Sequence, residues 1–374
     1  MNTTRGAQAR GLWMRAVPFT ALRALLFFAA QHPEGLRAKD LDAIAGQLRT
    51  SAGKPPARTT RYHYRNVLLG LKILERRGER YFVRRNDPLV EDLLLALRPE
   101  ESELTPEERR CFAELVLRNP DCQEHFFSLF ADGEPLTDLE RFVAQGQPVA
   151  WRVLPKSSKA VPESSPETSQ SQKRPRRKRR KPAWLPVRIW NLVSNRERLL
   201  TTEGERQALL YGIRYWARDE LGFIDETFLE RYGNVMFPVE MEGPTPDPRV
   251  IRFLQERLAP GQEWTTFSLR ELTAELCPAL KIPVRRFFAT LRALHRAHPS
   301  WIVWVPTSPF IAAFTAASTF EEQLQLRSYF RDERGRYISH FWAHERLREV
   351  EPPRGRRRSF PSDGRGSRRV QRRS

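Results

Sequence analysis

The sequence predicts a mainly α-helical protein with short β hairpins, in which a disordered basic linker joins two folded units. Three observations lead to this expectation. Apolar residues recur at helical spacing over much of the chain. Two stretches, one near each end, read as three helices followed by a strand-like run. Between them lies a segment with almost no large apolar residues, which cannot offset its ordering entropy by burial.

The composition favours a folded protein with a polyanionic partner. The 374 residues include 40% hydrophobic residues, enough for folded cores, and carry a formal net charge of +19. Such an excess points to nucleic acid, and less often to an anionic membrane. No apolar run approaches the ~20 residues that span a bilayer, so no membrane partner is expected.

Cysteine usage indicates the compartment. The three cysteines, Cys111, Cys122 and Cys277, form an odd and sparse set, which favours a reducing environment over a disulfide framework. The expected location is cytoplasmic, in association with the nucleoid, or nuclear in a eukaryotic host.

The positive charge is concentrated in two stretches. One run reads KRPRRKRRK and comprises Lys173, Arg174, Arg176, Arg177, Lys178, Arg179, Arg180 and Lys181 around one proline. The tail over 354–374 holds nine arginines and one acidic residue. Outside them, residues 1–90 hold 17 Lys or Arg against 6 acidic residues, whereas 91–155 hold 6 against 14. Clustered cations of this kind displace counterions from a nucleic-acid backbone. The alternatives are a solvated linker or a nuclear-import signal.

The first unit is expected within residues 1–90. Helices are predicted from about Phe19 to Gln31, from about Arg37, and after Thr59 or Thr60, either of which is a good N-cap. A short turn and the strand-like run at 81–83 follow.

This order resembles the winged helix-turn-helix superfamily over roughly residues 18–85, in topology rather than in a signature motif. The resemblance implies that the third helix enters the major groove of DNA and that the hairpin, called the wing, flanks the backbone. The third helix would present Arg58, Thr59, Thr60, Arg61, His63, Arg65 and Asn66. The wing would carry Arg76, Arg77, Arg80, Arg84 and Arg85.

Two details of the third helix sharpen this expectation. Arg61 and Arg65 are four residues apart and should share one face, and arginine can pair with guanine as asparagine can with adenine. Of Tyr62 and Tyr64, one should lie in the core and the other at the surface. The alternative is a solvent-facing basic helix in a winged helix that binds protein.

The rest of the chain is divided by composition. An acidic helical extension is expected over 91–155, with Thr105 as the N-cap of a helix that starts at Pro106. A disordered basic linker follows at 156–182, then a helical region at 183–247, a second winged-helix-like domain with C-terminal helices at 248–350, and a disordered Arg-rich tail at 351–374.

The second winged-helix-like domain is expected to contain helices at 250–258, 268–277 and 284–297, a strand at 301–305 and a further helix at 320–329. On or near its third helix would lie Arg285, Arg286, Arg292 and Arg296, the first three of them as candidate nucleic-acid contacts.

No catalytic constellation, metal site or cofactor is predicted. Cys111, Cys122 and His125 lack the fourth ligand that structural zinc requires. The carboxylates of Asp219, Glu220, Asp225 and Glu226, near Glu230, could converge on a metal ion as in a nuclease, but acidic residues in helical turns are usually solvated.

The leading interpretation is a non-enzymatic DNA-binding protein, a sequence-specific transcription regulator or accessory factor, whose basic segments add long-range attraction. RNA in place of DNA, a protein partner and a homodimer stay open. One alternative is a plasmid-type replication initiator with paired winged helices. Another is a subunit of a larger nucleic-acid-processing, defence or chromosome-organising complex, with winged helices as protein docks.

Overall fold

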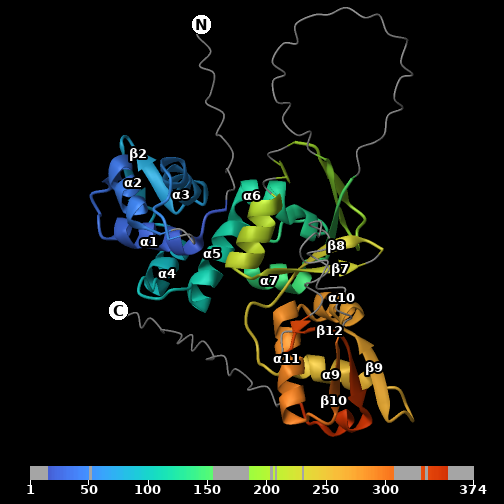
Figure 1. The fold of residues 1–374 in the computed structure, drawn as a ribbon. Helices are drawn as coiled ribbons and strands as arrows, with labels where there is room; N and C mark the ends of the chain where they lie inside the picture. Colours follow the sequence, from blue (N-terminus) through green and yellow to red (C-terminus); the bar gives the residue numbers. More distant parts are fainter. Residues whose placement is uncertain are drawn as a thin grey trace, which may run out of the picture.

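The computed structural model describes residues 16–49, 53–154, 185–202, 205–206, 209–229, 231–306, 330–332 and 336–352. The fold is α/β, with 46% helix, 21% strand and three antiparallel sheets, one of them five-stranded (Figure 1). The expectation of a mainly α fold with short β wings, in two domains joined by a disordered basic linker, is therefore wrong. The additional strands lie mostly in the middle of the chain.

The N-terminal unit combines three helices with a small sheet. Its elements are α1 (Phe19–Ala30), β1 (Leu36–Arg37), α2 (Ala38–Gln47), α3 (Arg58–Gly70), β2 (Leu74–Arg77) and β3 (Arg80–Val83). Strand β3 lies between β1 and β2, and Tyr81 is opposite both Leu36 and Arg76. The predicted helices and strand are present, but α3 begins at Arg58 after Ala57, so the expected cap at Thr59 or Thr60 is wrong.

The central unit contains a group of helices followed in the chain by a five-stranded sheet, with the helix η2 between the strands β6 and β7. Its elements are α4 (Pro88–Ala96), α5 (Pro106–Arg118), α6 (Pro120–His125), η1 (Phe127–Phe130), α7 (Leu139–Gln145), β4 (Val149–Val153), β5 (Val187–Asn191), β6 (Glu197–Leu200), the π-helical η2 (Leu209–Glu220), β7 (Ile224–Leu229) and β8 (Gly233–Pro238). The predicted cap of α5 is confirmed: Thr105 Oγ1 accepts from Glu108 N at 3.2 Å, and the Glu108 carboxylate accepts from Thr105 N at 2.7 Å.

The five-stranded sheet has the strand order β6-β5-β4-β8-β7. The way in which its strands are connected shows that the basic segment is not the linker between domains that the sequence predicts. Strands β4 and β5 pair from Val149–Asn191 to Val153–Val187, and Leu154 N donates to Pro186 O at 2.8 Å. The chain over 156–182 therefore leaves and re-enters one sheet and does not link two domains. That segment itself lies outside the described residues.

The C-terminal unit contains α9 (Pro248–Glu256), β9 (Trp264–Ser268), α10 (Leu269–Leu280), α11 (Val284–Ala297), β10 (Ile302–Pro306), β11 (Phe330–Arg331), β12 (Tyr337–His344) and η4 (Glu345–Glu349). Strand β12 pairs with β9, β10 and β11, so that Phe341 is opposite both Phe267 and Trp304. The three predicted helices and the strand after them are confirmed, within a few residues at their ends. The helix expected at 320–329 lies outside the described residues.

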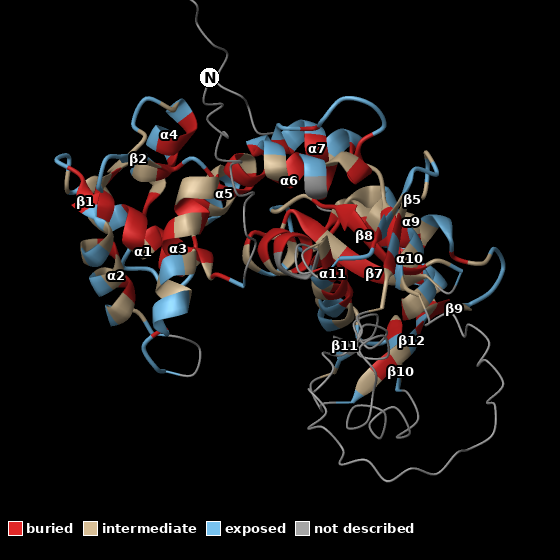
Figure 2. Cartoon of the chain, turned by 90° about the horizontal axis from the view of Figure 1, so that it is seen from above, coloured by how far each residue is buried: buried red, intermediate tan, exposed pale blue. Residues whose placement is uncertain are grey.

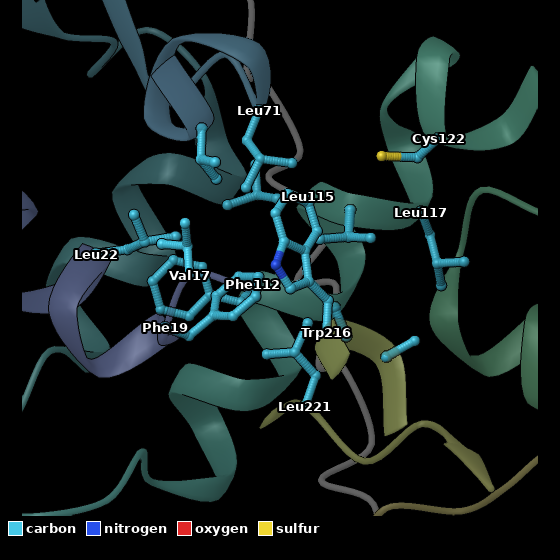
Figure 3. Close-up of a cluster of buried hydrophobic side chains, with 14 of the residues drawn as sticks. Val17, Phe19, Leu22, Leu71, Phe112, Leu115, Leu117, Cys122, Trp216 and Leu221 are labelled. Carbon is cyan, nitrogen blue, oxygen red and sulfur yellow. The ribbon is translucent and has the colours of Figure 1, made fainter. Parts of the chain in front are cut away.

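Two apolar cores stabilise these units. The first runs from Val17 to Met236, so the N-terminal and central units share it. Figure 3 shows part of it, where the ring of Phe19 lies 4.9 Å from that of Phe112 and 5.5 Å from that of Trp216. The second core begins at Phe237, the residue after Met236 on β8. Successive residues of a strand point to opposite faces, so this strand contributes to both cores.

Candidate nucleic-acid interface

Helix α3 packs against α2 and leaves its first turns mostly exposed (Figure 2). Its inner face is buried in the first core through Tyr64, Val67 and Leu68. Its outward face carries a set of polar side chains, three of them exposed and the last half-buried: Arg58, Thr59, Tyr62 and Asn66. The spacing of four residues between Tyr62 and Asn66 stacks them on one side of the helix.

The two tyrosines of α3 separate as expected. The Tyr64 side chain is buried, and this burial raises the pKa of its hydroxyl. Tyr62 is 47% exposed, and its ring stands edge-on to that of His63 at a centroid distance of 5.9 Å. Tyr62 was not among the predicted site residues. The available signal was the spacing, because residues two apart on a helix point in nearly opposite directions and only one can enter the core.

Arg65 is directed into the unit rather than toward solvent. It is only 8% exposed, and its Nη1 donates to Asp42 Oδ1 at 2.7 Å and to Ala38 O at 3.3 Å. Its guanidinium carbon lies 5.4 Å from the ring centres of both Tyr62 and Tyr81. Arg65 therefore joins α2, α3 and β3, and it supports the exposed ring of Tyr62 from behind.

Arg61 also makes contacts inside the unit. Its Nε donates to Pro56 O at 2.9 Å, and its guanidinium covers Gly46 of α2, where a Cβ would come within 2.8 Å of Nη1. Arg61 and Arg65 therefore share one side of α3, as their spacing predicts, but that side faces α2 and is not the outward face of the helix. Thr60 and His63 are half-buried at its edges.

The hairpin of β2 and β3 brings five arginines to the same unit. Arg76 and Arg77 are exposed beside the turn at Gly78; Arg76 Nε donates to Gly78 O at 2.8 Å, and Arg77 pairs with Glu75. The other three donate to backbone carbonyls: Arg80 to Gly35 at 2.8 Å, Arg84 to Lys72 at 3.4 Å and Arg85 to Ala30 at 2.8 Å. A carbonyl carries no net charge, so these hydrogen bonds do not neutralise the arginines, although Arg80 also lies close enough to the Glu34 carboxylate to help lower its pKa.

The arginines of α11 divide into two groups. Arg285, Arg292 and Arg296 are exposed. Arg286 is 7% exposed, and its Nη2 donates to Glu240 O at 2.7 Å. Burial lowers the pKa of Arg286, against the opposing effect of the Glu240 carboxylate. Arg286 is therefore a contact between α11 and the segment that follows β8.

The carboxylates considered for a nuclease have structural partners. Glu226 is 4% exposed and accepts from Trp151 Nε1 at 2.8 Å and from Arg214 Nε at 3.1 Å. Asp225 accepts from Val284 N at 2.7 Å, and burial raises the pKa of its carboxyl. In the part of the chain that the structure describes, no three His, Cys, Asp or Glu side chains gather as a metal site requires. This placement gives the nuclease alternative no support.

The carboxylate of Glu220 and the thiols of Cys111 and Cys122 also lie in structural surroundings. Helix α1 is tied to η2 because Glu220 Oε2 accepts from Phe19 N at 2.9 Å. Cys122 is buried, and the partial burial of Cys111 raises the pKa of its thiol to about 11. A thiol with such a pKa is almost entirely protonated, and unreactive, at neutral pH.

The basic run at 173–181 and the Arg-rich tail lie outside the described residues. The structure fixes where the first of them is attached: Leu154 and Leu185, at adjacent ends of β4 and β5, precede and follow the segment. No helix among the described residues is long and apolar enough to cross a membrane. Comparison of the chain with protein-family models, curated proteins and solved structures finds no match.

Proposed function

We propose that the protein binds duplex DNA sequence-selectively through its N-terminal unit, with α3 in the major groove and the β2–β3 hairpin beside the backbone. The observation that carries this proposal is the exposed, polar outward face of α3 next to a hairpin rich in arginine. The order α1-β1-α2-α3-β2-β3, with β3 between its two neighbours, supports it because this arrangement is typical of winged helix-turn-helix domains.

The side chains on the outward face suit base edges. The Asn66 amide can bond to adenine and the Arg58 guanidinium to guanine, while Thr59 can contact a thymine methyl group. The Tyr62 hydroxyl can reach a phosphate or a base edge. The arginines of the hairpin suit phosphates, which position a protein on DNA without reading its sequence.

The surplus of cations in residues 1–90 supports a polyanion as the binding partner. The basic run and the tail would add a sequence-independent contribution to the affinity for DNA. This function requires no catalytic group, and it fits a transcription regulator or an accessory factor. RNA is less favoured because a helix enters the major groove of B-form DNA, whereas that of A-form RNA is too narrow.

The test is selection of the full-length protein against a random duplex pool, with sequencing of the retained molecules at low and at physiological salt. The proposal predicts a recurrent motif. Arg58→Ala should alter the motif or weaken binding to it, whereas Arg141→Ala, which removes an exposed arginine from α7, should leave both unchanged. Retention of duplexes without any motif would reject sequence-selective binding and favour a protein-docking role in a larger complex.

A second candidate, a replication initiator with paired winged helices, is favoured by one observation. The C-terminal unit places α9, β9, α10, α11 and β10 in the same order as α1, β1, α2, α3 and β2. After the short strand β11, β12 lies between β9 and β10, as β3 lies between β1 and β2. Mapping of the selected motif onto natural DNA separates the candidates. Several directly repeated copies at an origin support an initiator, and single copies at promoters support a regulator.

A further inference from the structure

The start of α11 is held against the five-stranded sheet. Val284, its first residue, is buried and donates its backbone N–H to Asp225 of β7 at 2.7 Å. Arg286 is bound to Glu240 beyond β8, and its guanidinium fills the space beside Gly243, where an added Cβ would clash with Nη1. Protein groups therefore occupy the side of the first turn that carries Val284 and Arg286, whereas Arg285 between them is exposed.

This differs from α3, although the two helices hold the same place in their units. The first residues of α3, Arg58 and Thr59, are exposed. Base reading by helix-turn-helix proteins uses the N-terminal residues of the recognition helix. Helix α11 is thus poorly placed to read bases in that manner.

The exposed surface of α11 has a different character. Arg285, Arg292 and Arg296 follow one another at seven and four residues, which places them on one side of the helix and spreads them over about 16 Å at a rise of 1.5 Å per residue. The opposite side is apolar and packs in the second core through Phe287, Leu291 and Leu294. Helix α11 contains no acidic residue.

The segment around Arg331, in the same unit, extends this surface. Arg292 Nη2 donates to the backbone O of Arg331 at 3.2 Å, and the side chain of Arg331 is itself exposed. A row of cations with few donors or acceptors of other kinds offers little discrimination between base edges. It suits phosphates, because guanidinium groups bond to them bidentately.

We infer that the face of α11 formed by Arg285, Arg292 and Arg296 binds the phosphate backbone of duplex DNA and adds affinity without adding sequence selectivity. The inference rests on the proposed function, since it assumes that α3 selects the sequence. The two third helices then have different tasks: α3 reads bases, and α11 holds the adjoining backbone.

The test uses the full-length protein and two triple variants. One carries Arg285→Ala, Arg292→Ala and Arg296→Ala; the other carries lysine at the same positions and keeps the charge. Binding is measured to the selected duplex and to a scrambled duplex of equal length over a range of salt concentrations. Circular dichroism and thermal unfolding confirm that both variants fold like the original protein.

The alanine variant should bind both duplexes more weakly by the same factor. The slope of log affinity against log salt should fall by as much as roughly 2.7, or about 0.9 for each lost phosphate contact. The lysine variant should retain most of the slope. A changed ratio between the two duplexes would overturn the inference, because α11 would then read bases, and so would unchanged affinity and slope. Failure of the original protein to prefer the selected duplex would instead reject the proposed function.

Discussion

Arg65 lies where α2, α3 and β3 meet, and its guanidinium makes two kinds of contact there. It donates to Asp42 and to the carbonyl of Ala38, and it lies 5.4 Å from the rings of Tyr62 and Tyr81. A guanidinium beside a ring contributes about 0.5–1 kcal/mol at exposed sites. Arg65 therefore stabilises the unit and fixes the exposed ring that we propose faces DNA.

Arg65→Ala should lower the free energy of unfolding by about 2 kcal/mol, because a charged hydrogen bond is lost and Asp42 keeps its charge without this partner. The Asp42 side chain is 34% exposed, so solvent screens part of the loss. Urea unfolding of Arg65→Ala, Asp42→Ala and the double variant measures the loss of unfolding free energy and the coupling between the two side chains. Strictly additive effects of the two substitutions would contradict the coupling described here.

The cations of α3 could be counted from the sequence, but their directions could not be predicted. The i, i+4 spacing shows correctly that Arg61 and Arg65 are neighbours on the helix. It does not show which side of the helix is buried beside α2, because Asp42, the partner of Arg65, lies 23 residues away. The spacing of Tyr62 and Tyr64 was more informative, since a single core can accept only one of them.

At the scale of elements, the pairing of β4 with β5 determines how the basic run is attached. Five residue pairs join the strands, from Val149–Asn191 to Val153–Val187. Their far ends are closed by the bond from Leu154 N to Pro186 O. The segment between them is therefore an insertion into a sheet, and the fold does not need its length to connect two domains.

Replacement of residues 155–184 by a tight four-residue turn should preserve the fold. Closing a shorter loop costs less entropy, so the free energy of unfolding should rise by up to about 2 kcal/mol. The salt dependence of DNA binding should decrease, because the cations of the basic run are removed. Thermal unfolding and salt titrations of the shortened protein measure both effects. Loss of the folded state would show that the insertion is part of the structure.

Helices were predicted well where caps and amphipathic spacing coincide, as at α5 with its Thr105–Glu108 capping box. The strands of the central sheet were missed for two physical reasons. Strand β8 is buried at every position, so it lacks the alternation that marks a half-buried strand. The partners β4 and β5 are far apart in sequence, and local patterns cannot reveal such pairing. In its described residues, the region read as helical at 183–247 therefore contains the strands β5, β6, β7 and β8 and the long helix η2.

At the scale of the whole molecule, the central unit lies between the two outer units. Its helix α5 and η2 meet α1 in the first core, and strand β7 of its sheet contacts α10 and α11. Strand β8 contributes Met236 to the first core and Phe237 to the second. Beyond it, Glu240 accepts from Arg249 at 2.7 Å and from Arg286, which fastens the C-terminal unit. The central unit, through its helices on one side and its sheet on the other, can thus hold α3 and α11 in a fixed relation, as the division of tasks that we propose for them requires.

The central claim is that the outward face of α3 selects a DNA sequence. The most direct measurement is the ratio of affinities for the selected duplex and a scrambled duplex, for the original protein and for Asn66→Ala. A base contact contributes about 1–3 kcal/mol of discrimination, so the ratio should fall by roughly fivefold to 140-fold, with little change in affinity for the scrambled duplex. An unchanged ratio, or equal weakening on both duplexes, would contradict it.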